Sequence, residues 1–152
     1  MKLRIGYKQP SIKGYCHVDP KPVTDNVVPY EGELENINLD KICDNNECTD
    51  IIAGELINYI PVDKVFAVLS HVCMKLRHLG RITVGGTDSR MLALGIVNGG
   101  LDPAEANKVI YAEGHKSILP MNDMALLLSK IGLVVLSREF NGGNYLITAE
   151  RP

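Results

Sequence analysis

Glycine and aspartate at the ends of two short apolar runs are the first residues whose types and spacing could do chemistry. Lys2–Gly6 predicts a strand ending in glycine, and Gly14–Asp19 a second strand ending in an acid. In nucleotide-binding α/β folds, the glycine lets the backbone approach the ligand and the acid accepts hydrogen bonds from ribose hydroxyls. Here the gap between the runs is too short for a helix, and Tyr7-Lys8-Gln9-Pro10 stands where a glycine-rich turn is expected.

Three further titratable residues are candidates for the site: two follow predicted strands and one lies in an irregular segment. Glu55 comes after a buried strand predicted over Thr49–Gly54, where open α/β sheets bind ligands, although an acid there also suits a helix start. Asp88 follows a strand predicted over Arg81–Gly85 and is either a base or, more often at such a position, the N-cap of the next helix. His115 lies in an irregular segment; histidine titrates near neutrality and suits proton removal, but surface loop histidines are common.

Strand signals alternate with helical stretches along the chain, which is typical of an α/β layered domain. The longest helix is predicted over Pro61–Leu79, because apolar residues recur there at threes and fours, and Gly80 is its expected cap. Asn141-Gly142-Gly143 joins two β-rich runs and is a strong hairpin signal. The other predicted elements are a short strand Glu33–Ile37, helices Asn38–Asn45, Ser89–Val97, Pro103–Tyr111 and Met121–Ile131, and the hairpin runs Leu133–Phe140 and Asn144–Ala149.

Composition restricts the class of protein. The 152 residues fit a single domain over residues 1–152, and 45% of them are hydrophobic. The net charge of −2 does not favour nucleic-acid or anionic-membrane binding. No apolar run approaches a membrane span and the first residues do not resemble a signal peptide, so we expect a cytoplasmic protein. Cys43 and Cys48 lack the second pair of ligands that a zinc site needs.

The order of these motifs resembles the class I S-adenosylmethionine-dependent methyltransferases. It is most similar to a small branch of that family whose first strands run "LNLGCG…GWxNVD"; here they read Leu3-Arg4-Ile5-Gly6 and Gly14-Tyr15-Cys16-His17-Val18-Asp19. Asp50–Glu55 resembles the fourth strand with its acid, and Leu76–Val84 the step into the fifth. His115–Leu133 and the terminal "NYLITAERP" resemble the family's last helix and last strand.

This resemblance implies a Rossmann-like fold: a mostly parallel twisted sheet with a C-terminal antiparallel hairpin and helices on both faces. It implies S-adenosylmethionine as cofactor, with Gly6 at its methionine end and Asp19 on the ribose. Glu35 falls near the adenine edge, although a solvated charge is an equal interpretation, and Glu55 is placed to neutralise the amino group or to face the acceptor. Catalytic bases are then Asp88 and His115, and the acceptor is a small molecule or a saccharide.

The chain also departs from that family. Tyr7 and Lys8 replace two motif glycines, Ile57-Asn58-Tyr59 stands for a common "LEH" triplet, and His78-Leu79-Gly80 for a "PGG" turn. An alternative is therefore a methyltransferase-like scaffold without catalysis that acts as a binding or assembly partner, and a homo-oligomer is left open. A dehydrogenase ranks last, because the Gly-x-Gly-x-x-Gly fingerprint is absent and Asp19 follows Gly6 too soon.

Overall fold

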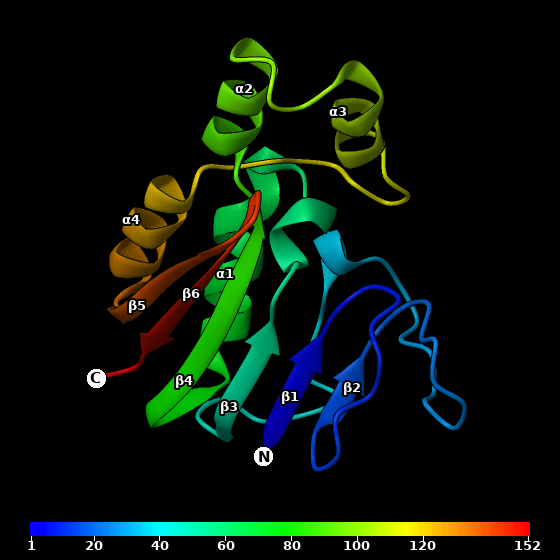
Figure 1. Cartoon of the computed structure of the whole chain (residues 1–152). Helices are drawn as coiled ribbons and strands as arrows, with labels where there is room; N and C mark the ends of the chain where they lie inside the picture. The colour runs from blue at the N-terminus through cyan, green and yellow to red at the C-terminus, as the bar shows by residue number, and fades with distance from the viewer.

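A six-stranded mixed sheet organises the chain, and the computed structural model describes all of residues 1–152 (Figure 1). The strand order is β2-β1-β3-β4-β6-β5, with the first four strands parallel and β6 antiparallel to both of its neighbours. The strands are β1 (Lys2–Ile5), β2 (Cys16–Val18), β3 (Cys48–Ala53), β4 (Leu76–Thr87), β5 (Val134–Asn141) and β6 (Asn144–Glu150). The predicted mostly parallel sheet with a C-terminal antiparallel hairpin is thus confirmed.

Four α-helices and three short 3₁₀ helices complete the fold. In Figure 1, α1 and α4 lie behind the sheet, while α2 and α3 stand beyond the carboxyl ends of the parallel strands. The α-helices are α1 (Val65–Met74), α2 (Ser89–Val97), α3 (Pro103–Ile110) and α4 (Met121–Ile131), and the 3₁₀ helices are η1 (Leu34–Asn36), η2 (Leu56–Tyr59) and η3 (Val62–Lys64). None of these helices is long and apolar enough to cross a membrane.

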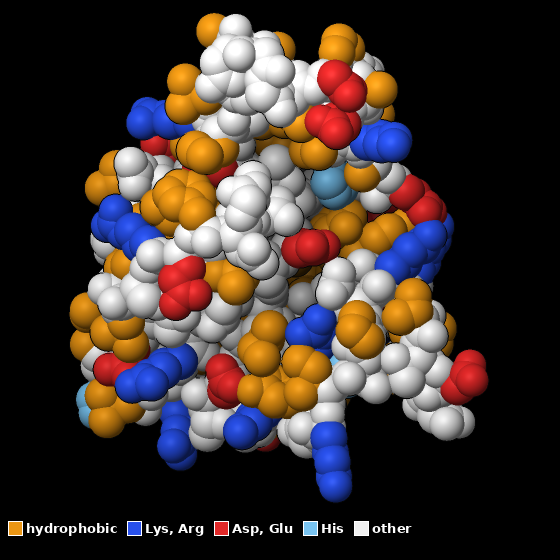
Figure 2. Space-filling view, viewed as in Figure 1, with side chains coloured by type: hydrophobic (Ala, Val, Ile, Leu, Met, Phe, Trp, Pro, Cys, Tyr) orange, Lys and Arg blue, Asp and Glu red, His pale blue; other side chains and the backbone are white.

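The core lies on one face of the sheet. Leu3, Ile82 and Ile147 are fully buried in one hydrophobic cluster with residues of α1 and α4. Their neighbours Arg4 and Thr83 belong to the opposite face of the sheet, because side chains alternate along a strand, and stay partly exposed. Figure 2, seen from that second side, shows charged side chains of both signs across the face. Helices were predicted on both faces. The second layer is missing because the β1–β2 connection, residues 6–15, is too short for a crossover helix.

The helix predicted over Pro61–Leu79 ends earlier, and the strand after it begins earlier. α1 stops at Met74 and β4 starts at Leu76, so Gly80 lies inside a strand rather than capping a helix. Leu79 donates its N–H to the Arg151 carbonyl and has a φ of 59°, so pairing with the C-terminal tail overrides the helical spacing. A Cβ at Gly80 would lie 2.8 Å from the Cys48 carbonyl oxygen, which explains glycine at this crossing.

Two other predicted elements also differ. The strand expected over Glu33–Ile37 is instead the single turn η1, and Asn38–Asn45 forms turns rather than a helix. Both belong to the long connection from β2 to β3, which buries Leu34 and Leu39 against the core on the α1 side. The helix over Met121–Ile131 has the predicted bounds, and the glycine after it takes a left-handed conformation as a C-cap.

Candidate functional site

The carboxyl edge of the sheet brings the predicted strand-end residues together. The chain leaves β1 for β2 on one side and returns past β1 to β3 on the other, so the topological switch point lies between β1 and β3. Gly6 follows β1, Asp19 follows β2 and Glu55 closely follows β3, all at this edge. Open α/β sheets bind ligands at such a point, outside the carboxyl ends of the strands.

A side chain of the protein itself lies across the switch point. Gln9 donates from Nε2 to Glu55 Oε2 over 3.1 Å and accepts at Oε1 from Nη2 of Arg4 over 3.0 Å. A Cβ added at Gly6 would lie 2.6 Å from Gln9 Cγ, so this side chain covers the glycine at which the backbone is open to a ligand. The Nε of Arg4 is buried there with no hydrogen-bond partner. Sequence reasoning missed both Gln9 and Arg4.

The side chain of Asp19 stabilises, through hydrogen bonds, the loop that replaces the glycine-rich turn. Its side chain is 2% exposed; Oδ1 accepts the backbone N–H of Lys8 at 3.1 Å and of Lys21 at 2.8 Å, and Oδ2 accepts that of Gln9 at 2.9 Å. Lys8 has a φ of 55°, a left-handed conformation that the carboxylate helps to hold. A carboxylate offers about four acceptor positions, so Asp19 keeps about one for a ligand.

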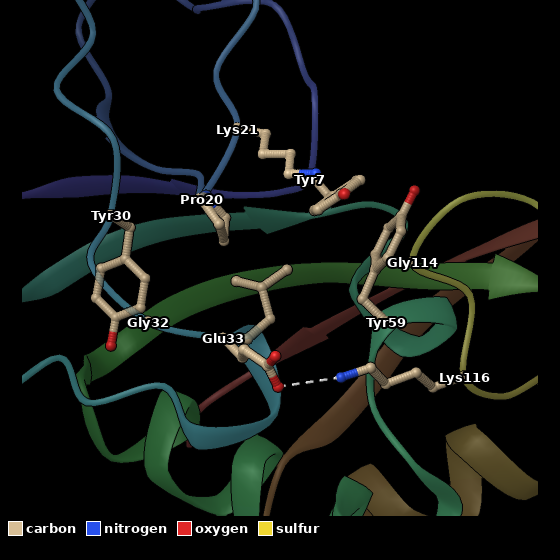
Figure 3. A pocket seen from close by; sticks show the side chains of 10 residues that line it. Tyr7, Pro20, Lys21, Tyr30, Gly32, Glu33, Tyr59, Gly114 and Lys116 are labelled. Atoms are coloured by element: carbon tan, nitrogen blue, oxygen red, sulfur yellow. Dashed lines mark hydrogen bonds and ion pairs between the residues drawn. The ribbon is translucent and has the colours of Figure 1, made fainter.

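A cavity of about 420 Å³ lies beside these strand ends, under the residues shown in Figure 3. We call it the tyrosine cavity, because Tyr7, Tyr30 and Tyr59 line it together with Lys21 and Lys116. The rings of Tyr7 and Tyr59 pack with centroids 4.8 Å apart, and burial raises the pKa of Tyr59 to about 12. Its aromatic walls and volume suit a flat, drug-sized ligand.

Glu35 lies near the tyrosine cavity but is committed to ion pairs. Its carboxylate pairs with Lys116, which lines the cavity, and with Lys64 at 3.3 Å. The hydrogen bond from Lys116 is the main cause that lowers the pKa of Glu35 to about 2. Lys116 also contacts Glu33 at 3.2 Å, the pair drawn in Figure 3. Glu35 therefore positions a lysine of the cavity wall.

Glu113 ties the connection between α3 and α4 to the loops after β1 and β2. Its carboxylate forms ion pairs with Lys8 and, over 3.0 Å, with Lys21, and it accepts the Tyr7 hydroxyl at 3.2 Å. The hydrogen bonds from Lys8 and Lys21 lower the pKa of Glu113 to about 2. These contacts tie Tyr7 and Lys21, which line the tyrosine cavity, to the α3–α4 connection, and no motif in the sequence pointed to them.

The two predicted bases have different environments. Asp88 is 3% exposed and accepts the N–H of Met91 at Oδ1 and of Met121 at Oδ2, both over 2.8 Å. It thus caps α2 and joins it to the start of α4. His115 holds Nδ1 2.8 Å from the Val109 carbonyl oxygen. Since that oxygen can only accept, Nδ1 is the donor, and Nε2 forms no hydrogen bond within the protein.

Comparison with known proteins identifies the fold. No family model matches the chain, and no curated protein matches it. Among solved structures, a SAM-dependent methyltransferase from Archaeoglobus fulgidus is 12% identical with a TM-score of 0.61, over 89% of this chain and 75% of that one. A Haloferax volcanii complex of the Trm112 methyltransferase activator and a putative methyltransferase matches at 9% identity and a TM-score of 0.61. The match covers 90% of this chain and 71% of that one.

A third structure contains ligands. The Burkholderia thailandensis 1,6-didemethyltoxoflavin-N1-methyltransferase, with bound 1,6-didemethyltoxoflavin and S-adenosylhomocysteine, is 12% identical with a TM-score of 0.56, over 91% of this chain and 62% of that one. At such identities the likeness concerns the backbone arrangement. The chain therefore has the fold of the class I SAM-dependent methyltransferases, as its sequence predicted.

Proposed function

We propose that this chain is an S-adenosylmethionine-dependent methyltransferase that acts on a small molecule. The observation that carries the proposal is the convergence of Gly6, Asp19 and Glu55 from three strand ends at the topological switch point, beside the tyrosine cavity. The methyltransferases of similar fold support it, one of them with S-adenosylhomocysteine bound. When bound, this cofactor supplies a methyl group on a sulfonium, so the protein mainly binds and aligns the reactants.

The residues at the carboxyl edge of the sheet have the chemical character that each part of this cofactor requires. The aromatic walls of the tyrosine cavity suit the adenine, and the remaining acceptor position of Asp19 suits a ribose hydroxyl. Glu55 suits the ammonium group and Arg4, whose Nε is buried and unpartnered, suits the carboxylate. Gln9 now holds both of these charged groups, so its side chain must move aside for the amino-acid end.

His115 is the proton acceptor in this proposal. The Val109 carbonyl fixes its Nδ1–H and leaves Nε2 free to take a proton from the acceptor. The carboxylate of Asp88, by contrast, is buried and occupied by two backbone N–H groups. We therefore assign Asp88 to holding α2 and α4 in place and His115 to proton removal.

Calorimetric titration with S-adenosylmethionine and S-adenosylhomocysteine tests the proposal directly. We expect saturable binding of either compound at micromolar concentrations, weakened in a Glu55→Gln variant, because the carboxamide loses the charge that pairs with the ammonium. An Asn122→Ala variant, altered on the exposed face of α4, should bind like the wild type. Absence of binding at millimolar concentration in both the wild type and a Gln9→Ala variant would refute the proposal.

That negative result would favour the second candidate, a methyltransferase-like binding or assembly protein without catalysis. The specific observation behind it is that hydrogen bonds within the chain already occupy the candidate site. Gln9 bonds to Arg4 and Glu55, and Asp19 accepts three backbone N–H groups. The fold is compatible with complexes, since the Haloferax volcanii methyltransferase is bound to an activator. Light scattering during size-exclusion chromatography would then show whether the partner is a second copy of this chain.

A further inference from the structure

A second cavity of about 410 Å³ lies at the carboxyl end of β4 and is lined by α2, the α3 region and the β5–β6 hairpin. We call it the hairpin cavity. Its apolar walls come from Met91 and Leu92 of α2 and from Leu101 and Val109 around α3. Glycines make up most of the remaining lining, and no charged side chain takes part. An ionic group placed against this lining would find no charged partner, so the lining favours a neutral and largely apolar ligand.

The only polar side chains that line the hairpin cavity are Thr87, which is buried, and Asn144, which is exposed. Thr87 links Asn144 to the buried Asn58 through hydrogen bonds. Thr87 donates its N–H to Asn58 Oδ1 over 3.0 Å and receives the Asn58 Nδ2 at Oγ1 over 3.3 Å. The Thr87 hydroxyl donates to Asn144 Oδ1 over 3.2 Å, which fixes the orientation of that amide. The Nδ2 of this exposed amide forms no hydrogen bond within the protein and can donate to water or to a ligand oxygen.

The sequence of α2 matches this use. The helix is almost entirely apolar after its first two residues, yet it buries only Leu92. Met91 stays 43% exposed and Leu94 58% exposed, and Figure 2 shows apolar side chains at the α2 and α3 end of the molecule. Gly95 lets the chain fold back closely, because a Cβ there would lie 3.2 Å from Leu101 Cβ. Of the side chains of α2, Met91 and Leu92 line the cavity, and the exposure of Met91 is poorly explained by core packing alone.

The hairpin cavity adjoins the proposed base. Val109 lines it, and the same residue accepts the Nδ1–H of His115. The His115 ring packs edge-on against Tyr59 of the tyrosine cavity, with centroids 5.4 Å apart. His115 is thus tied to one wall of each cavity.

We infer that the hairpin cavity is the acceptor site and that it takes a neutral hydroxylated aromatic molecule of the phenol class. The apolar walls accommodate the ring and the Asn144 amide meets the hydroxyl oxygen. A saccharide fits less well, because most of its hydroxyls would be buried against aliphatic side chains without partners. This inference rests on the proposed function for its role in catalysis, but binding in the cavity requires no cofactor.

The absence of tryptophan provides a clean reporter. A Met91→Trp variant carries the only indole of the chain at the rim of the hairpin cavity. It is titrated without cofactor with p-cresol, benzoate and methyl glucoside. We expect a saturable change of indole emission with p-cresol, binding of benzoate at least tenfold weaker, and no response to the glucoside. Calorimetry on the wild type checks that the indole does not create the site.

A blocking variant tests the location. Gly143→Phe adds a ring at the hairpin, where a Cβ meets no atom within 4 Å and φ is not positive, so the fold should tolerate it. It should weaken p-cresol binding at least tenfold, whereas Lys130→Phe on the exposed face of α4 should not. Equal p-cresol binding in the Gly143→Phe variant, stronger binding of the glucoside, or no p-cresol binding to the wild type would overturn the inference.

The outcome is separable from that of the cofactor experiment. Binding of p-cresol without binding of S-adenosylhomocysteine would support the hairpin cavity as a phenol site and contradict methyl transfer. Binding of S-adenosylhomocysteine without p-cresol would leave the proposed function standing and remove this acceptor class.

Discussion

Replacing Gln9 with alanine should strengthen cofactor binding. In the free protein its carboxamide bonds both Arg4 and Glu55, the two charged groups proposed to receive the amino-acid end of the cofactor. A hydrogen bond to a charged group contributes about 1.5–3 kcal/mol, and less where water competes, as at this partly exposed side chain. In the variant the cofactor no longer competes with Gln9 for Arg4 and Glu55. Binding should therefore be stronger by about 2 kcal/mol, which lowers Kd roughly 30-fold.

The assay is calorimetric titration of wild type, Gln9→Ala and the matched control Asn122→Ala with S-adenosylhomocysteine. The backbone N–H of residue 9 still reaches Asp19 in the variant, so the loop keeps its anchor, and the free energy of unfolding should fall by only about 1–2 kcal/mol. Equal affinity of wild type and Gln9→Ala would show that this side chain does not compete with the ligand. Weaker binding by Gln9→Ala would show instead that Gln9 is a contact of the cofactor.

Four further substitutions separate structural from functional roles. Asp19→Ala should lower the free energy of unfolding by about 2–4 kcal/mol in denaturant titration, because three backbone N–H groups lose a buried acceptor; an unchanged midpoint would contradict this. Asp88→Ala should lower the free energy of unfolding by about 2–4 kcal/mol in the same titration, because α2 loses its cap and the buried N–H of Met121 loses its acceptor. His115→Gln should slow methyl transfer, once an acceptor is found, while S-adenosylhomocysteine affinity stays the same; an unaltered rate excludes this base. The folded pKa of Glu113 is lowered to about 2, so its stabilising effect is present above its ordinary pKa near 4.5 and disappears as the pH falls toward 2. Glu113→Gln should therefore flatten the acid side of the Tm-against-pH curve, and an identical curve would refute this role.

The helices α2 and α4 and the final hairpin could be predicted because their signals are local. An N-cap at Asp88, a left-handed glycine after Ile131 and the glycine turn after Asn141 each act on neighbouring residues. The placement of Gly6, Asp19 and Glu55 at one edge also followed from the sequence, because the carboxyl ends of parallel strands meet there.

The end of α1 shows where local signals failed. Apolar residues continue at helical spacing through Leu76, but this residue begins β4 and is fully buried in the sheet. The strand continues where Leu79 pairs with Arg151, a residue at the far end of the chain. Strand pairing with a segment so distant in sequence has no trace in the local pattern.

The sequence by itself thus determined the order of the elements and the edge at which the candidate cofactor residues gather. Only the tertiary structure decided what those residues do there: it put Gln9 between Arg4 and Glu55 and tied Lys8 to Glu113. It also decided that one face of the sheet lacks helices. The physical reason is that turns, caps and strand direction depend on neighbours in sequence, whereas hydrogen bonds and ion pairs between distant segments form only when the packed fold brings those segments together.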